Sequence, residues 1–390
     1  MGFAGNTSVP LTEAKASKKY SFLRSTQLFF ALQNAFKAPR AKKYVDTLFK
    51  EAPEAKEVVK GKLSIVTGVT VGGTGYHMAE ELALNAGMSV ILMGRNSSKL
   101  EKAEKSIRAE AKKRGVNSPV LYCVLYDLDD LSTVKSAADE ASKIANERYG
   151  GKIHVLINNA GGSCPVYQLS KQGIEGSVAR NFLAPHLLTA SLLPLLKAAS
   201  TTSYKPRCVF VASLGYSLTL DYDPLQMLKK PNEGGAPDGT LKFDKHGNYL
   251  GQQMTLFENY GRAKLGCVAT AHHWANIEPS INFTSQHPGS IVSSFGKSLG
   301  FVGVLYYYGF YFFNFSPSQG ARAALRAALD PDFNTVKELQ GAYLHADGNP
   351  WPKDSLRIID PDTNKSYTWN KYAKAVYNSA NTLIANVLKK

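Results

Sequence analysis

Two kinds of hydrophobic pattern alternate along the chain from residue 62 onward. Short apolar runs of five to seven residues cover 63–67, 89–93, 120–126, 154–158, 207–212 and 281–286. Longer segments between them carry apolar residues three or four positions apart, which predicts helices. Strands that alternate with helices at this interval predict a parallel, doubly wound sheet between two layers of helices, an α/β fold.

Residues 1–61 precede the first predicted strand and have a different pattern. Aromatic and aliphatic residues among basic and small ones predict an amphipathic helix over residues 20–36. Residues 1–45 contain eight Lys or Arg and a single acid, Glu13. This pattern is typical of an interfacial membrane helix or an organelle transit peptide, and equally of a helix packed on the main domain. We therefore divide the chain into a basic, membrane-associating or targeting extension, 1–61, and a main domain, 62–390.

A second apolar segment covers residues 299–315, with nine aromatic residues and no charge. It is shorter than the roughly 20 residues of a spanning helix, and tyrosine suits the bilayer interface. A monotopic membrane patch, a lid over a lipid substrate and an ordinary buried helix are the alternatives, and we favour the first two together. We therefore expect peripheral or monotopic contact with an intracellular membrane, the endoplasmic reticulum or a lipid droplet before the mitochondrion.

The composition narrows the list of partners. The net charge of +15 is compatible with nucleic acid, an anionic membrane surface or an anionic cofactor. The chain lacks a Lys/Arg-rich run, zinc-finger spacing and an RNA-binding aromatic motif, so we expect no nucleic acid partner. The cysteines are widely spaced, which indicates neither a metal site nor a disulfide framework and fits a reducing compartment. They are Cys123, Cys164, Cys208 and Cys267.

A glycine-rich turn joins the first predicted strand to the helix that follows. Its glycines let the backbone approach a pyrophosphate, and the helix start offers unpaired N–H groups. The glycines are Gly68, Gly72, Gly73 and Gly75. Arg95 follows the second strand, where a carboxylate would read a ribose 2′-hydroxyl. An arginine there can bind a 2′-phosphate instead, which favours NADP(H) over NAD, unless Arg95 is only a solvated residue at the strand end.

Tyr260 and Lys264 lie four residues apart in a predicted helix, and therefore on one face of it. An ammonium group near a phenol favours the phenolate, and brings tyrosine toward use as a general acid or base. An ordinary amphipathic helix would also carry this pair. The upstream glycine turn, Asn181 and Ser213 favour the catalytic interpretation.

Taken in their order along the chain, these motifs resemble those of the short-chain dehydrogenase/reductase family. This family has a Rossmann fold, and the resemblance covers about residues 62–390. Within it the chain is most similar to the retinol dehydrogenase and WW-domain oxidoreductase branch, including a late helix at 318–322, a strand at 341–344 and a C-terminal helix from Trp369. The motif residues are Thr67, Gly68, Gly73, Thr74, Gly75, Asp127, Asn158, Asn159, Ala160, Gly161, Asn181, Ser213, Tyr260, Lys264, Pro288 and Gly289.

The resemblance implies a role for each residue of a catalytic tetrad. Tyr260 would be the general acid in carbonyl reduction, or the base in the reverse direction. Lys264 would lower the pKa of that tyrosine and hold the nicotinamide ribose. Ser213 would hydrogen-bond the substrate oxygen, and Asn181 would anchor a water that relays protons to Lys264.

The resemblance also implies which residues contact the cofactor, and it implies no metal site. Thr67 and the glycine turn would face the phosphates, and Asp127 the adenine side. Asn158 and Gly161 would flank the ribose, while Pro288 and Gly289 would lie against the nicotinamide. The family turn is usually Thr-Gly-x3-Gly-x-Gly. Gly73 and Gly75 match it only with one extra residue, whereas Gly72 fits the spacing but leaves Thr74 where glycine is expected. The individual phosphate contacts therefore stay open.

We therefore expect an NADP(H)-dependent oxidoreductase that interconverts an alcohol and a carbonyl on a lipophilic substrate, such as a retinoid, polyprenol, sterol or long-chain lipid. The family resemblance is compatible with a homodimer of this chain. One alternative is a double-bond reductase resembling light-dependent protochlorophyllide reductase, and another is a cofactor-binding regulator without turnover. A long segment, 217–251, separates Ser213 from Tyr260 and forms either a lid over a large substrate or a surface insertion.

Overall fold

The computed structural model describes residues 39–162, 168–213, 253–289, 291, 315–350, 358–359, 366–367 and 369–389. The predicted helix at 20–36, the segment 217–251 and most of the aromatic segment, 299–314, lie outside these residues. The described residues nevertheless include every predicted strand and every predicted site residue.

A seven-stranded parallel sheet forms the centre of the molecule, in the order β3-β2-β1-β4-β5-β6-β7. The six strands predicted from apolar runs are confirmed, each within one residue at either end. Most of these runs are buried on both faces, and such continuous apolar runs are plain in the sequence. The strands are β1 (Leu63–Thr67), β2 (Ser89–Gly94), β3 (Leu121–Leu125), β4 (Val155–Asn158), β5 (Arg207–Val211), β6 (Asn282–Gln286) and β7 (Tyr343–Leu344).

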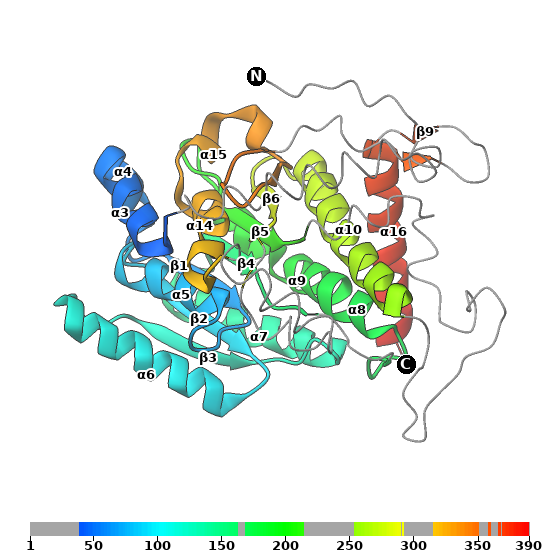
Figure 1. The fold of residues 1–390 in the computed structure, drawn as a ribbon, viewed down its shortest axis with the longest axis horizontal. Helices are drawn as coiled ribbons and strands as arrows, with labels where there is room; N and C mark the ends of the chain where they lie inside the picture. Colours follow the sequence, from blue (N-terminus) through cyan, green and yellow to red (C-terminus); the bar gives the residue numbers. More distant parts are fainter. Residues whose placement is uncertain are drawn as a thin grey trace.

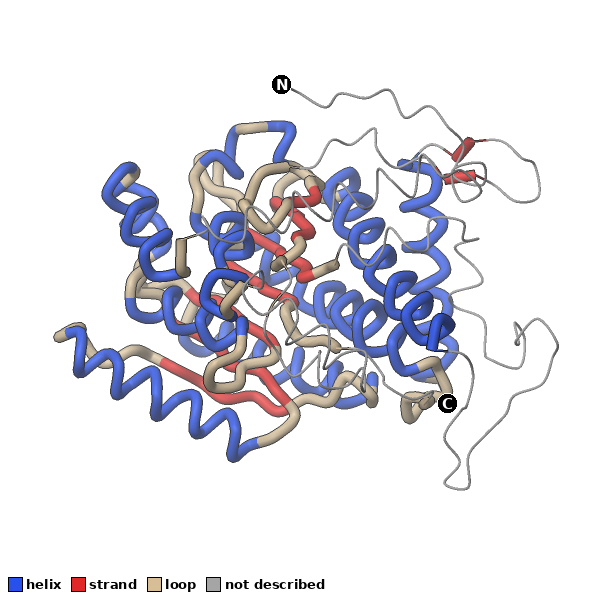
Figure 2. Tube along the Cα trace, in the orientation of Figure 1, coloured by secondary structure: helices blue, strands red, loops and turns tan. Residues whose placement is uncertain are grey.

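Helices cover both faces of the sheet, which confirms the doubly wound, three-layer α/β fold (Figures 1 and 2). Alternate strand residues belong to opposite layers: Ile65 packs in one hydrophobic cluster and Val66 in the other. The first layer contains α7 (Leu131–Arg148), α9 (Ala184–Ala198), α10 (Gln253–Ile277) and α16 (Trp369–Leu388). The second contains α3 (Ala41–Glu51), α4 (Pro53–Val59), α5 (Thr74–Leu84), α6 (Ser97–Arg114) and α14 (Arg322–Leu329).

Shorter elements complete the described chain. They are α8 (Gly176–Val178), the π-helical turn η2 (Ala179–Leu183), α13 (Pro317–Gly320), α15 (Asp332–Thr335), the 3-10 turn η7 (Lys337–Leu339) and the strand pair β8 (Ile358–Ile359) and β9 (Ser366–Tyr367). Within the described ranges, no helix combines the length and the apolar character needed to cross a membrane.

The strand order reverses between β1 and β4, because β2 pairs with one side of β1 and β4 with the other. The strands are parallel, so all of them end at the same edge of the sheet. In open α/β sheets, ligands bind at this edge where the order reverses. The fold therefore brings together the predicted site residues that follow β1, β2, β4 and β5.

Two helices of the N-terminal extension belong to the packed domain. Ala41 and Val45 of α3 and Val59 of α4 are at most 2% exposed and lie in the same cluster as α5 and α14. The backbone N–H of Ala41 donates to Ser318 Oγ at 3.2 Å, which ties the start of α3 to α13. Residues 41–59, which sequence analysis assigned to the extension, are thus structurally continuous with the α/β unit.

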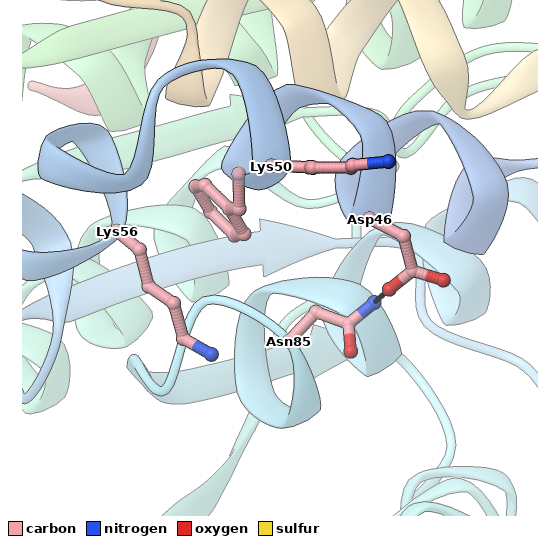
Figure 3. A pocket seen from close by; sticks show the side chains of 5 residues that line it. Asp46, Lys50, Lys56 and Asn85 are labelled. Carbon is pink, nitrogen blue, oxygen red and sulfur yellow. Dashed lines mark hydrogen bonds between the residues drawn. The ribbon is translucent and has the colours of Figure 1, made fainter.

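A hollow of about 320 Å³ lies where α3 and α4 meet the end of α5 (Figure 3). Asn85 donates from Nδ2 to Asp46 Oδ1 at 3.0 Å, and this bond joins α5 to α3 at the hollow. Lys50, Lys56 and Phe49 complete the lining. These residues come from the outer side of the second helix layer, whereas the predicted site lies at the strand ends.

The C-terminal helix α16 packs along α10, and the two lie side by side in Figure 1. Trp274 of α10 meets the Tyr377 ring edge-on, with the ring centroids 5.0 Å apart. His186 of α9 shares a hydrogen bond of 2.8 Å with Asn381 Oδ1, and complete burial lowers the pKa of this histidine to about 4. Helix α16 therefore holds α10, which carries Tyr260 and Lys264, against α9.

Candidate functional site

The glycine turn after β1 leads directly into the start of α5. Gly68 and Gly72 both have φ of +75°, a left-handed conformation that favours glycine. Gly73 is the N-cap residue of α5, and no side chain caps the helix. The first N–H groups of the helix therefore lack a side-chain partner at this end, which is the arrangement that binds phosphate groups in nucleotide sites.

Gly75 explains the unusual spacing of the turn. A Cβ on Gly75 would lie 2.5 Å from Asn159 Nδ2 and 2.7 Å from the carbonyl oxygen of Gly68. Only glycine lets α5 approach the turn so closely. Gly72 thus supplies the left-handed turn, Gly73 caps the helix and Gly75 makes the close contact, so the irregular spacing still forms a compact cradle.

Asn159 holds this cradle, although sequence analysis gave it no role in the site. Its Nδ2 donates to the carbonyl oxygen of Thr67 at 2.8 Å, at the end of β1. The hydroxyl of Thr67 in turn accepts from the N–H of Ala160 at 2.9 Å. These bonds tie the ends of β1 and β4 together. The Asn-Asn-Ala-Gly motif was the available signal, but which of its residues faces the turn depends on contacts that sequence does not show.

Arg95 lies immediately after β2 and is exposed. Within the described part of the chain it makes no hydrogen bond or ion pair. Asp127, two residues beyond β3, is half-buried and accepts from the N–H of Asp129 at 3.1 Å. Both residues therefore lie at the edge of the sheet that carries the glycine turn.

The side chain of Asn158 points into the core. Its Nδ2 donates to Thr189 Oγ1 at 3.0 Å, and the residue is 4% exposed. Its Oδ1 has no hydrogen-bond partner in the described ranges. The structure thus gives Asn158 a place in the packing of β4 against α9, and a contact with ribose would have to come from its backbone.

Asn181 lies in η2 and is nearly fully buried. Its Oδ1 accepts from the N–H of Gly162 at 2.9 Å, and its Nδ2 donates to the Gly162 carbonyl at 2.8 Å. A Cβ on the preceding Gly161 would lie 2.5 Å from this Oδ1 and 3.4 Å from Lys264 Nζ. The segment after β4 therefore passes directly between Asn181 and the lysine.

Lys264 is 4% exposed, and its ammonium group donates to the carbonyl oxygen of Val211 at 2.8 Å. Val211 ends β5, and the half-buried Ser213 follows two residues later. The ammonium also lies 5.7 Å from the centre of the Tyr260 ring. The structure thus brings Tyr260, Lys264, Asn181 and the end of β5 into one neighbourhood.

Pro288 and Gly289 follow β6 at the same edge of the sheet. Gly289 has φ of +87°, and the ring of Phe315 occupies the place that a Cβ would need. Phe315 is the one described residue of the predicted aromatic segment, and it is 2% exposed. The end of that segment therefore packs against the residues expected to face the nicotinamide.

Comparison with known proteins agrees with this arrangement. The family model for short chain dehydrogenases matches residues 62–216. An uncharacterized oxidoreductase of Schizosaccharomyces pombe is 33% identical over 296 residues, 73% of this chain and 77% of its own length. The chain belongs to the short-chain dehydrogenase/reductase family. The resemblance to this family, which the sequence motifs indicated, is confirmed.

Two named relatives confirm the resemblance to the retinol dehydrogenase branch. Human polyprenol dehydrogenase is 28% identical, over 80% of this chain and 83% of its own length. Mouse retinol dehydrogenase 12 is also 28% identical, over 77% of this chain and 82% of its own. This short-chain dehydrogenase thus aligns with most of the length of both enzymes.

Solved structures show the same fold. The oxidoreductase yciK from E. coli matches with a TM-score of 0.51 and 18% identity, over 75% of this chain and 97% of its own. A short chain dehydrogenase from Shigella flexneri, solved in complex with NADP, matches with a TM-score of 0.50 and 18% identity, over 75% and 99%.

We predict that Gly75→Ala distorts the cradle. The added methyl group would overlap Asn159 and the Gly68 carbonyl, so α5 must shift, at a cost of about 1–3 kcal/mol in the free energy of unfolding. Urea unfolding and nucleotide titration should both show the loss. Gly162→Ala is the matched control, because among the described residues, its own chain neighbours aside, no atom lies within 4 Å of its added Cβ. A Gly75→Ala protein as stable as this control would contradict the role given to Gly75.

Proposed function

We propose that this short-chain dehydrogenase is an NADP(H)-dependent oxidoreductase that interconverts an alcohol and a carbonyl group on a lipophilic substrate. The observation that carries the proposal is the position of Lys264. Its buried ammonium lies between the Val211 carbonyl and Gly161, with the Tyr260 ring 5.7 Å away. A phenol beside an ammonium, at the strand ends of a nucleotide-binding fold, suits proton transfer to a substrate oxygen.

Each residue of the tetrad has a distinct part in this proposal. Tyr260 gives its proton to the carbonyl oxygen in reduction and takes it back in oxidation. Lys264 favours the tyrosinate by its charge, and Ser213 donates a hydrogen bond to the same substrate oxygen. Asn181 holds the Gly161–Gly162 backbone beside Lys264, which places the cation. The predicted relay water on Asn181 remains part of the proposal.

The cradle and Arg95 are the residues that would hold NADP(H). The uncapped start of α5 suits the pyrophosphate, and Asp127 lies on the side expected for the adenine. The backbone of Asn158 and Gly161 would flank the ribose, with Pro288 and Gly289 against the nicotinamide. When bound, the cofactor supplies or accepts the hydride. The exposed guanidinium of Arg95, which makes no ion pair with another described residue, suits a 2′-phosphate and favours NADP(H) over NAD(H).

The substrate class is inferred from two relatives and from composition. Polyprenol dehydrogenase and retinol dehydrogenase 12 are named for long apolar alcohols. The segments expected to enclose the substrate, 217–251 and 299–315, lie almost wholly outside the described residues. Phe315, buried against Gly289, supports an apolar wall on the nicotinamide side of the site.

We predict that Tyr260→Phe abolishes most turnover. The change removes only the hydroxyl group, and general acid–base catalysis typically contributes a factor of about 100–10,000. Retinal and a polyprenal should be reduced with NADPH by the wild type, and at least about a hundredfold more slowly by the variant. Unchanged NADPH affinity and an unchanged unfolding midpoint are the controls. Full activity in Tyr260→Phe would refute the catalytic assignment.

A second prediction concerns cofactor preference. Arg95→Ala should weaken NADPH binding about tenfold, as expected for a lost charge-assisted hydrogen bond, and leave NADH binding unchanged. Fluorescence titration with both nucleotides measures this. Lys99→Ala removes a nearby exposed charge from α6 and serves as the control for general electrostatic attraction. Equal weakening by both variants would mean that Arg95 is only a solvated residue at the strand end.

We also propose peripheral membrane contact through residues 1–38 and 299–314, on the basis of their basic and aromatic composition. The endoplasmic reticulum or a lipid droplet is the proposed compartment. We also propose that the protein forms a homodimer. Because residues 41–59 belong to the core, the variant to use lacks residues 1–38 only. The full chain should pellet with anionic phosphatidylserine vesicles, and the shortened chain should pellet less. A full chain that stays in the supernatant would count against membrane contact.

A further inference from the structure

The carbonyl group of Asn181 lacks its usual helical partner. In an α-helix, that oxygen would accept from the N–H four residues later. Here that residue is Pro185, which has no N–H. The chain forms the π-helical turn η2 at this point, between α8 and α9. The sequence thus removes a backbone donor from one member of the proposed tetrad.

Cys267 supplies a donor to this oxygen. Its Sγ lies 2.6 Å from the Asn181 carbonyl, and its side chain is 2% exposed. Cys267 follows Lys264 by three residues on α10 and so lies on the same side of the helix. Burial raises the pKa of the Cys267 thiol to about 11, although the nearby Lys264 charge acts in the opposite direction. The thiol therefore keeps its proton at neutral pH.

The residue before Cys267 makes a second close contact with the same turn. A Cβ on Gly266 would lie 2.7 Å from the ring of Phe182, which follows Asn181. The backbone of α10 therefore lies directly against the turn, and only glycine leaves room for the ring. Gly266 and Cys267 hold two successive residues of η2.

The side chain of Asn181 makes three hydrogen bonds to neighbouring backbone groups. It exchanges two hydrogen bonds with Gly162, and its Nδ2 also donates to the Ser177 carbonyl at 3.0 Å. A shift of the Asn181 backbone would therefore move Gly161 and Gly162. Gly161 lies next to the Lys264 ammonium, so such a shift would change the surroundings of that cation.

We propose that Cys267 is a positioning residue: its thiol hydrogen bond to the Asn181 carbonyl, whose α-helical donor is replaced by Pro185, keeps Asn181, and with it the Gly161–Gly162 segment, in place beside Lys264. The proposal rests on the proposed function, and on the role that the family resemblance implies for Lys264, which is to hold the nicotinamide ribose. The bond joins α10, which carries Tyr260 and Lys264, to the η2–α9 segment, which carries Asn181. The cysteine acts as a buried hydrogen-bond donor and not as a nucleophile.

Three variants separate the hydrogen bond from packing. Cys267→Ser keeps a donor, Cys267→Ala removes the donor and leaves a small space, and Cys267→Val removes the donor while filling that space. Val268→Ala is the control, because it removes buried volume from the next position of α10 without removing a donor. Urea unfolding of all four variants measures any general loss of stability.

The first readout needs no turnover. A hydrogen-bonded thiol has a lowered infrared S–H stretching frequency, and the wild-type spectrum minus the Cys267→Ala spectrum isolates this one thiol. We expect a lowered band that persists in Val268→Ala. A difference band at the frequency of a free thiol would overturn the proposal, whether or not the protein binds a nucleotide.

The second readout compares NADPH with 2′-phospho-ADP, which keeps the pyrophosphate and lacks the nicotinamide ribose. In Cys267→Ala and Cys267→Val we expect the dissociation constant of NADPH to rise about fivefold, as for one lost hydrogen bond, and that of the fragment to stay unchanged. Cys267→Ser should bind NADPH like the wild type. Equal NADPH binding by all variants, or equal losses for both ligands, would overturn the proposal. A wild type that binds neither ligand would instead refute the proposed function. The infrared band would then still test whether the Cys267 thiol donates to the Asn181 carbonyl.

Discussion

The buried ammonium of Lys264 is the constraint on which the rest of the site depends. A cation removed from water is unfavourable unless polar groups compensate for the lost solvation. Here the Val211 carbonyl accepts from it at 2.8 Å, and the Tyr260 ring lies 5.7 Å away. Satisfying this cation fixes α10 against the end of β5. That one placement brings the tyrosine, the lysine and the segment before Ser213 to the edge where the strand order reverses.

Two further groups of contacts keep this edge in shape. Asn159 joins β1 to β4 beneath the glycine turn, so the cradle and the segment before Gly161 move together. On the outer side, α16 packs along α10 through the Trp274–Tyr377 contact and the α9 histidine, His186. The cradle is thus held from within the sheet, and the helix with Tyr260 and Lys264 is held from outside it.

Sequence predicted the sheet well, because runs such as 63–67 and 207–211 are buried on both faces and need no partner to be recognised. It also placed Tyr260 and Lys264 on one face, since helical periodicity alone decides that. It missed Asn159 and Cys267, whose roles depend on groups 92 and 86 residues away in the chain. It also separated 41–59 from the domain, because the packing of two short helices depends on the surface that they meet, which a local pattern does not contain.

The most direct test of the central claim is the fate of the transferred hydrogen. NADPH carrying deuterium at the reactive C4 position would be incubated with an unsaturated lipid aldehyde such as retinal, and the product analysed by mass spectrometry and NMR. The account predicts deuterium on the carbinol carbon, with the double bonds intact. Deuterium on a former alkene carbon would contradict it and assign the protein to double-bond reduction.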